Sequence, residues 1–349
     1  MTLTRANWQD GVAGILARGA VIPAHPLALD ASRSLDARRQ RALTRYYLDS
    51  GAGGLAVGVH TTQFAIREVG LYEPVLRLAV ESARSWTTRP LVLIAGVAGR
   101  TEQAVREAEI ARGLGYHAAL MSMAAFKGAG EDELIGHARA VASVMPVVGF
   151  YLQPAVGGIV LPYSFWRRFA AIDNVVAIKI APFHRYRTLD VIRGVIDAGA
   201  ADRIALYTGN DDHIVADLVS PFRLGGRSVR IVGGLLGHWS VWVKSAVELL
   251  KRCQQAAASD SVPADLLALD AQVTDCNAAV FDVANNFHGV IAGCHEVLRR
   301  QGLLEGIWCL DPNEGLSPGQ AEEITRVARA YPHLIDDDFV AANRARWLG

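Results

Sequence analysis

Short apolar runs recur along the first two thirds of the chain, at the spacing of about thirty residues that is typical of strand–helix units. They lie at 19–27, 53–59, 90–97, 117–123, 146–153, 175–181, 204–209 and 229–234. Near-continuous apolar runs indicate parallel strands that are covered on both faces. The stretches between them are amphipathic; in 101–115, for example, Ala104, Ala108 and Ala111 share one helical face. The pattern therefore predicts eight strands that alternate with helices.

Eight strand–helix units predict an α/β fold of the (β/α)8 TIM-barrel type. A doubly wound open sheet is the alternative, but no Gly-rich GxGxxG turn follows the first run. After the eighth run the pattern becomes helical, beginning with 241–258. We therefore expect an N-terminal helical segment at 1–18, the barrel at 19–240 and a C-terminal helical extension without strands at 241–349.

The 35 basic and 35 acidic residues of this 349-residue chain give a net charge of zero. This balance gives no electrostatic reason to expect nucleic acid or an anionic membrane as a partner. No apolar run reaches the roughly 18 residues of a membrane span, and no secretory signal is recognisable. The four cysteines form no CxxC pair, which predicts free thiols in a cytoplasmic protein. Neither HExxH nor a tight His/Asp set occurs, so no metal or other cofactor is expected.

Lys179 is one of only four lysines, and it lies inside the apolar run 175–181. Because side chains alternate along a strand, Ala177 and Ala181 share its face and leave space beside the amine. If that face points into the barrel, Lys179 lies toward the C-terminal end of strand six, where barrel active sites form. Burial lowers the pKa of a lysine and frees the amine to attack a carbonyl carbon. The two interpretations are a Schiff-base lysine and a buried lysine paired with a carboxylate, although this strand carries no acidic residue.

Tyr151 is the second candidate, because it shares a face with Gly149 and Gln153 on the preceding run. It would then lie one strand away from Lys179, where its hydroxyl could relay protons. The alternative is an aromatic residue that fills the barrel, with its hydroxyl bonded to the backbone.

Polar residues at other strand ends are further candidates. Thr61 and Thr62, with their backbone amides, could hold a small carboxylate, or they could form an ordinary turn. His60 is either a proton donor or a polar residue at a strand end. Asp211 and Asp212 could bind metal, but capping of the following helix is the favoured interpretation.

At these residues the chain resembles the dihydrodipicolinate synthase / N-acetylneuraminate lyase family of class I aldolase barrels, over most of its length. The family's strand-five tyrosine motif corresponds to "YLQP", with Tyr151, and its "Ile-Lys" motif to "NVVAIK", with Lys179. "TGNDD", with Gly209, resembles the family's Ser-Gly-Asp-Asp, and the glycine segment at Gly233 is also a family feature. The resemblance implies a catalytic Lys179 and Tyr151, substrate contacts at Gly209 and Gly233, and a homo-oligomer, either a tetramer or a dimer.

The chain also departs from the family pattern. With "QFA" (63–65) aligned on the family's Glu-Phe-Ala, Thr61 is retained as a catalytic residue that anchors the substrate carboxylate, and His60 replaces a threonine of the proton relay. A one-residue shift would instead match Thr61 and Thr62 to the family's pair. Phe126 is nearest to the place of the tyrosine that the synthases donate across the subunit interface. Val156 stands where the synthases have an arginine that binds the acceptor's carboxylate.

The predicted function is a lyase or aldolase that acts through a Lys179 imine with pyruvate or another 2-oxo acid as its small-molecule substrate. An efficient dihydrodipicolinate synthase is not expected, because Val156 cannot replace a guanidinium. Arg185 and Arg187, just past the lysine strand, are the residues most able to supply one from another loop. The alternative is a barrel that binds a small 2-oxo acid or sugar acid without turning it over.

Overall fold

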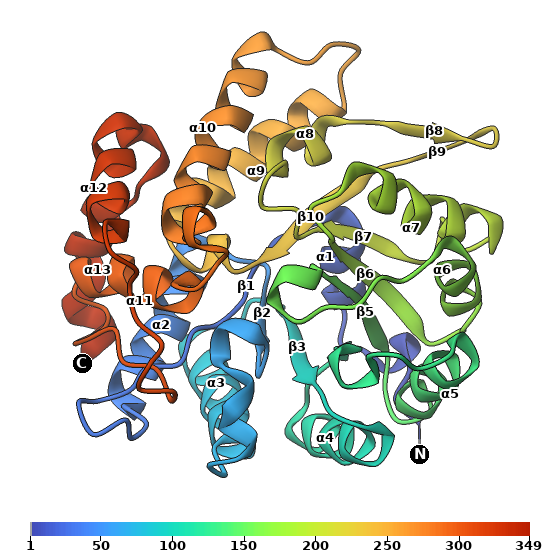
Figure 1. Ribbon diagram of the computed structural model, residues 1–349, viewed down its shortest axis with the longest axis horizontal. Coiled ribbons are helices and arrows are strands. Elements are labelled where there is room, and N and C mark those ends of the chain that lie inside the picture. The colour runs from blue at the N-terminus through green and yellow to red at the C-terminus, as the bar shows by residue number, and fades with distance from the viewer. Residues whose placement is uncertain (1) are drawn as a thin grey trace.

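The computed structural model describes residues 2–349 and contains a barrel of eight parallel strands (Figure 1). The strands are β1 (Val21–Pro23), β2 (Gly54–Val57), β3 (Val92–Val97), β4 (Ala118–Met121), β5 (Val147–Leu152), β6 (Val175–Ala181), β7 (Ala205–Thr208) and β10 (Ile231–Leu236). They pair in the order β1-β10-β7-β6-β5-β4-β3-β2. A parallel bridge between Ala24 and Ala56 brings the two end strands together and closes the ring. The predicted barrel is confirmed.

Helices surround the barrel and follow the strands in alternation (Figure 1). They are α2 (Ala37–Ser50), α3 (Tyr72–Trp86), α4 (Thr101–Leu114), α5 (Glu131–Ala142), α6 (Tyr163–Ala170), α7 (Arg185–Asp197), α8 (Ile214–Val219) and α9 (Val243–Ala257). Helix α1 (Val12–Arg18) instead precedes β1, and its Val12 and Leu16 belong to the apolar cluster inside the barrel. In α4 the predicted face is the buried one, because Ala104, Ala108 and Ala111 are all shielded from solvent. Helix α4 therefore buries its apolar stripe against the barrel.

Two apolar clusters hold the fold together, one inside the barrel and one outside it. The inner cluster includes Ile22, Ile94, Phe150 and Leu235, which fill the barrel as a packed core. The outer cluster lies between the strands and the helices and continues into the C-terminal helices. Along most of the strands, alternate residues contribute to the two clusters, as the period of two along a strand requires; on β6, Val176 and Ala177 both belong to the inner cluster.

A two-stranded antiparallel hairpin, β8 (Phe222–Leu224) and β9 (Arg227–Val229), projects from the barrel between α8 and β10 (Figure 1). Its turn uses Gly225 and Gly226, both with positive φ, a conformation that glycine adopts without strain. The prediction placed Val229 in the eighth barrel strand, whereas this residue ends the hairpin and the strand begins at Ile231. Both segments are β, so the apolar pattern alone did not separate them.

Beyond α9, the chain continues as α10 (Ala264–Val280), α11 (Val290–Arg300), α12 (Gln320–Ala330) and α13 (Asp337–Leu348), which lie along one side of the barrel (Figure 1). Helix α13 packs against α2, and α10 packs against α8. All four cysteines of the chain are buried and free, as predicted. Within residues 2–349, no helix combines the length and the apolar character needed to cross a membrane.

Candidate active site

Lys179 points into the barrel from β6, with Phe150 of β5 and Tyr207 of β7 as its neighbours in the sheet. Its side chain is 8 % exposed, and its Nζ lies 4.2 Å from the centre of the Phe150 ring. Ala177 and Ala181 belong to the inner cluster, so the predicted inward face is confirmed. Gly209, after β7, lies directly beside the lysine, because a Cβ at this glycine would come within 2.7 Å of the Lys179 Cε.

The side chains around Lys179 form one small pocket at the C-terminal end of the barrel, called here the lysine pocket. It encloses about 50 Å³. Its lining comprises Ala24, Val59, His60, Thr61, Phe150, Leu152, Gln153, Val156, Lys179, Ala181, Phe183, Gly209, Asp211, Gly237, Phe281, Phe287 and Val290. The lining is mainly apolar with a few polar groups, which is typical of small-molecule sites.

Burial controls the protonation of the polar groups in the lysine pocket. It lowers the pKa of Lys179 from 10.5 to about 8, although the negative charge of Asp211 opposes the shift. Burial, and then the nearby Lys179 charge, lower the pKa of His60 to about 4, which keeps this imidazole neutral near pH 7. For Asp211, burial raises the carboxyl pKa well above its usual range, while Lys179 acts in the opposite direction. Burial thus moves both groups toward their uncharged forms, while the ammonium of Lys179 still predominates at pH 7.

Tyr151 does not share the face of Lys179, and this prediction is wrong. The Tyr151 ring packs against Trp166 of α6, with 5.2 Å between the ring centres. The Tyr151 hydroxyl accepts a hydrogen bond of 3.2 Å from the Leu161 N–H. Tyr151 is therefore buried between the barrel and α6, and its hydroxyl is directed away from the lysine pocket.

A shift in strand pairing explains the error at Tyr151. Val147 pairs with Val175, whereas Val148 pairs with Ala177. The residue skipped on β6 moves the register by one position, and a shift of one residue exchanges the two faces of a strand. As a result Phe150, not Tyr151, lies opposite Lys179.

Of the three residues predicted at the end of β2, two line the lysine pocket and one lies outside its lining. His60 and Thr61 line the lysine pocket. The Thr61 hydroxyl donates to the Ala24 carbonyl (2.6 Å). The Thr62 hydroxyl lies outside the pocket lining, because it accepts from the Gly58 N–H (3.0 Å) and donates to the His25 carbonyl (2.7 Å).

Of the two glycines predicted to contact the substrate, only one lines the lysine pocket. Gly209 lines the lysine pocket, whereas Gly233 lies outside its lining, next to Ala20 and Tyr207. A Cβ at Gly233 would come within 2.6 Å of the Ala20 backbone, so this glycine allows two strands to approach closely. Gly237, four residues further along, is the glycine after β10 that reaches the pocket.

Asp211 is the functional candidate whose place the sequence interpretation missed. The helix that follows, α8, has His213 as its N-cap residue, so neither Asp211 nor Asp212 caps it. Asp211 is 4 % exposed, lines the lysine pocket, and its Oδ1 has no hydrogen-bond partner. The pairing of β7 with β6 could have indicated this position, since residues that follow neighbouring parallel strands meet at one edge.

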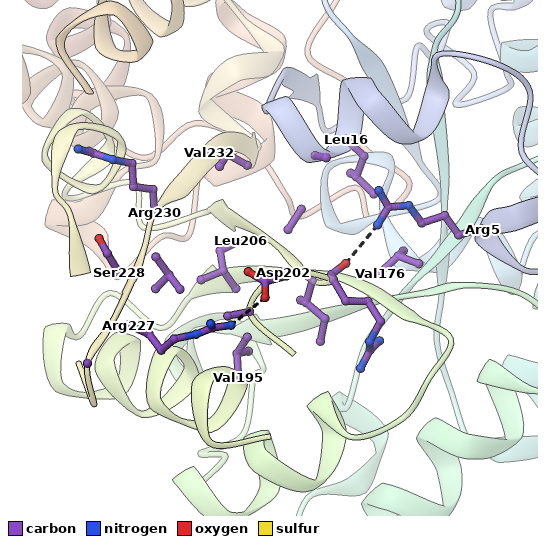
Figure 2. A pocket seen from close by; sticks show the side chains of 17 residues that line it. Arg5, Leu16, Val176, Val195, Asp202, Leu206, Arg227, Ser228, Arg230 and Val232 are labelled. Atoms are coloured by element: carbon purple, nitrogen blue, oxygen red, sulfur yellow. Dashed lines mark hydrogen bonds and ion pairs between the residues drawn. The ribbon is translucent and has the colours of Figure 1, made fainter. Parts of the chain in front are cut away.

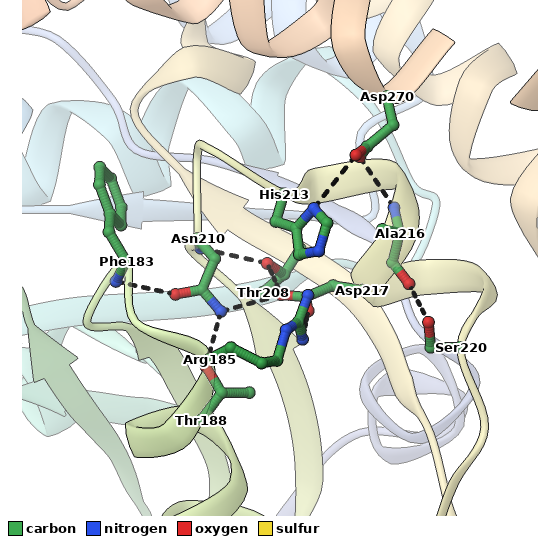
Figure 3. A network of polar contacts seen from close by, with 10 residues as sticks. All are labelled: Phe183, Arg185, Thr188, Thr208, Asn210, His213, Ala216, Asp217, Ser220 and Asp270. Atoms are coloured by element: carbon green, nitrogen blue, oxygen red, sulfur yellow. Dashed lines mark hydrogen bonds and ion pairs between the residues drawn. The ribbon is translucent and has the colours of Figure 1, made fainter. Parts of the chain in front are cut away.

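A buried polar network fixes the loops on either side of Asp211 (Figure 3). Asp217 of α8 accepts hydrogen bonds from Arg185 (2.6 Å), Thr208 (2.7 Å) and Asn210 (2.9 Å). The Oδ1 of Asn210 in turn accepts a hydrogen bond from the backbone N–H of Phe183 (3.1 Å). The network holds the Phe183 and Asp211 loops together.

The same network also holds Arg185, one of the two arginines after β6 that could have supplied a guanidinium to the lysine pocket. Arg185 is bound to the buried Asp217, and neither Arg185 nor Arg187 is part of the pocket lining. Val156 does line the pocket. The side chain at this point of the pocket is therefore apolar.

The loop between α10 and α11 closes the lysine pocket from the side of the C-terminal helices. Phe281 and Phe287 of this loop line the pocket, and Phe287 packs edge-on against Phe183 with 6.0 Å between ring centres. Phe183 and Phe287 both have positive φ (49° and 65°), which is rare for aromatic residues. Asp282 anchors the loop by accepting from the Gly289 N–H (2.9 Å) and from the Ser317 hydroxyl (2.5 Å).

A larger pocket of about 390 Å³ opens at the opposite end of the barrel, beneath β6, β7 and β10 (Figure 2). Its arginines bind protein groups: Arg5 donates to the Arg203 carbonyl (3.3 Å), and Arg227 pairs with Asp202 (2.7 Å). Arg230 likewise donates to the Val219 carbonyl (3.1 Å). This pocket lies at the end of the barrel that serves stability rather than catalysis.

The closed barrel and the lysine buried at its C-terminal end are the features of a class I aldolase or lyase. The chain belongs to the dihydrodipicolinate synthetase family, whose family model matches residues 18–260.

Individual relatives are distant but cover most of the chain. A 4-hydroxy-tetrahydrodipicolinate synthase of Anaeromyxobacter dehalogenans is 25% identical over 254 residues, which are 72% of this chain and 79% of the relative. N-acetylneuraminate lyase 2 of Escherichia coli O6:H1 is 22% identical over 321 residues, 91% of this chain and 94% of the relative.

Solved structures show the same fold at low sequence identity. YagE, a prophage protein of E. coli K12 solved in complex with pyruvate, has a TM-score of 0.75 and 18% identity, covering 90% of this chain and 98% of YagE. The dihydrodipicolinate synthase of Acinetobacter baumannii, also complexed with pyruvate, has a TM-score of 0.73 and 20% identity, covering 89% of this chain and 98% of that chain.

Proposed function

We propose that this protein is a lyase or aldolase that binds pyruvate or another small 2-oxo acid as an imine of Lys179. The observation that carries the proposal is the Lys179 amine itself, which is buried in an apolar pocket that lowers its pKa to about 8. Near neutral pH a useful fraction of this amine is uncharged and nucleophilic. Once formed, the imine withdraws electrons from the adjacent carbon, which can then lose a proton or be cleaved from an aldehyde.

The pocket and the relatives support a 2-oxo acid as the substrate. Two solved structures of similar fold contain pyruvate. In this chain the enclosed space of about 50 Å³ suits a molecule of that size better than a nucleotide. The neutral His60 and the backbone beside Thr61 border Lys179 and provide hydrogen-bond donors for a carboxylate.

Pyruvate followed by sodium borohydride tests the imine. We expect a single reduced adduct, which peptide mass spectrometry locates on Lys179. Lys251 is the internal control, because it is an exposed lysine paired with Glu248. No adduct on Lys179, or equal labelling of Lys251, would contradict the proposal.

Replacing Tyr151 with phenylalanine should leave the chemistry intact. The change leaves the buried Leu161 N–H without its acceptor, which costs about 1–3 kcal/mol of stability. Exchange of the pyruvate methyl protons with D2O, followed by NMR, should be unchanged, since this hydroxyl points away from Lys179. A loss of exchange on the order of 10²–10⁴-fold would return Tyr151 to the role of proton relay.

Binding without turnover remains the second candidate function, because Phe150 occupies the position opposite Lys179. A phenyl ring cannot transfer protons, so the site must obtain this function from another group. Methyl exchange, together with aldehyde release from a panel of 2-oxo sugar acids, separates the two functions. Trapping of the imine without either activity would favour the binding protein.

A further inference from the structure

The lysine pocket needs a group that moves protons, and Phe150 cannot do so. Forming an imine requires a proton for the departing oxygen, and forming the enamine requires removal of a proton from the adjacent carbon. Besides Lys179, the polar side chains that line the pocket are His60, Thr61, Gln153 and Asp211. One of these four must supply the function if the proposed imine chemistry takes place.

Three of the four are poorly suited. The Thr61 hydroxyl already donates to the Ala24 carbonyl, and an alcohol is a weak acid and a weak base. The amide of Gln153 is neither a useful acid nor a useful base near neutral pH. His60 is neutral near pH 7 because burial lowers its pKa to about 4, so it is a poor proton donor there. It retains the ability to hydrogen-bond a substrate carboxylate.

Asp211 differs from these groups in geometry. It is 4 % exposed, it follows the strand next to that of Lys179, and its Oδ1 has no partner within the protein. A buried polar atom without a partner costs free energy, so such an atom in a pocket indicates that a ligand completes it. The Asn210 and Asp217 network fixes the loop and so keeps this carboxyl in place.

We propose that Asp211 is the catalytic acid and base of the lysine pocket and takes the role that a tyrosine hydroxyl would have opposite Lys179. This proposal rests on the proposed imine function. Burial raises the pKa of the Asp211 carboxyl, which supports the assignment because a general acid works best with a pKa near the working pH. The charged groups around Asp211 are Lys179 and Asp212, and the Cys294 thiol is near enough for Asp211 to raise its pKa.

The proton transfers balance at every step. The uncharged Lys179 amine attacks C2 of the 2-oxo acid while the Asp211 acid protonates the carbonyl oxygen, and the amine nitrogen returns a proton to the carboxylate. Asp211 then protonates the hydroxyl, which leaves as water while the C=N bond forms. The carboxylate next removes a proton from C3, and the electron pair moves through C2 onto the nitrogen. The product is an enamine, and Asp211 is again an acid.

The test compares Asp211→Asn with the wild type in the exchange of pyruvate methyl protons with D2O. We expect exchange to fall on the order of 10²–10⁴-fold, the contribution of a general acid–base group. Asp212→Asn is the matched control, because this neighbouring aspartate is exposed and lies outside the lysine pocket; its exchange rate should be unchanged. Exchange in Asp211→Asn within about threefold of the wild type would overturn the proposal, since an acid–base group contributes far more.

A second measurement distinguishes proton transfer from an effect on the amine. The negative charge of Asp211 raises the pKa of Lys179, so Asp211→Asn should lower it and make the amine more reactive near pH 7. Labelling of Lys179 with acetic anhydride at a series of pH values should therefore shift to lower pH while exchange is lost. A parallel loss of labelling and exchange would show that Asp211 acts only through the lysine, and would overturn the proposal.

Borohydride trapping distinguishes a failure of the Asp211 proposal from a failure of the proposed imine function. A wild type that gives no adduct on Lys179 would remove the imine itself, and with it the proposed function. If the wild type gives the adduct, His60→Gln decides between the two titratable neighbours of Lys179. Loss of exchange in His60→Gln with retention in Asp211→Asn would assign the proton transfers to the imidazole and overturn the proposal for Asp211.

Discussion

Replacing Lys179 with arginine is expected to abolish the exchange of pyruvate methyl protons as completely as replacing it with alanine. A guanidinium stays protonated at any pH at which the protein is folded, so it cannot attack the carbonyl carbon. We expect a loss on the order of 10⁴-fold or more, the scale seen when an enzyme loses its nucleophile. Exchange by NMR and borohydride trapping by mass spectrometry measure the two consequences. Lys251→Arg, at an exposed position, is the matched control and should retain both.

Lys179→Met separates the loss of chemistry from a loss of folding. The pKa of Lys179 is 10.5 in its ordinary state and about 8 in the folded protein, so the unfolded chain holds more protons between these values. The wild type should therefore gain stability as the pH rises through this window, and the methionine variant should lack that gain. At pH 7 the variant should be at least as stable as the wild type, because it buries no ammonium. Residual exchange in a folded Lys179→Met would contradict a role for the imine.

The second large effect concerns the acceptor aldehyde. Aspartate semialdehyde carries a carboxylate, and the lining of the lysine pocket includes the apolar Val156, Leu152, Phe183 and Phe287 and contains no arginine. Losing a charge-assisted hydrogen bond costs roughly 1.5–3 kcal/mol, about ten- to 150-fold in affinity. We expect kcat/KM with aspartate semialdehyde to lie below about 10⁴ M⁻¹s⁻¹, the lower end of the usual enzyme range. An apolar or aromatic aldehyde should be used in preference.

Val156→Arg provides the complementary test. The new guanidinium at the pocket wall should improve the use of aspartate semialdehyde and reduce that of an apolar aldehyde, thereby reversing the preference. Steady-state assays with both aldehydes measure the ratio of the two values of kcat/KM. Efficient use of aspartate semialdehyde by the wild type would show that another group binds the carboxylate.

The fold and the lysine could be predicted from local pattern, because a strand that is covered on both faces leaves a continuous apolar signature. The face of Lys179 followed from the period of two along its own strand. The face of Tyr151 could not be predicted in this way, because it depends on how β5 pairs with β6. The irregular pairing near Val148 cannot be recognised from the composition of either strand. The number of residues between Tyr151 and Lys179 matches the spacing of the family's two motifs, but the register between β5 and β6 sets the direction of each side chain.

Residues from loops were harder to place than residues from strands. Asp211 looked like a helix-capping residue because it precedes α8, and only the arrangement of the loop directs it into the pocket. Phe183 and Phe287 reach the pocket through backbone conformations with positive φ, which no propensity predicts for phenylalanine. Phe287 is also more than 100 residues away from Lys179 in the chain, so only long-range packing brings the two together.

The phenylalanines that line the lysine pocket from the loop between α10 and α11 affect how the substrate range can change. Phe281 and Phe287 belong to a loop of the C-terminal helices, outside the 18–260 segment that the family model matches, whereas Lys179 and Asp211 belong to the barrel. Part of the surface that we expect to contact the aldehyde thus lies outside the barrel that carries the proposed reactive groups, while Val156 and Phe183 belong to the barrel. Mutations in the loop can diversify the accepted aldehyde while the barrel conserves the reaction. For directed evolution, this loop is the segment to randomise first.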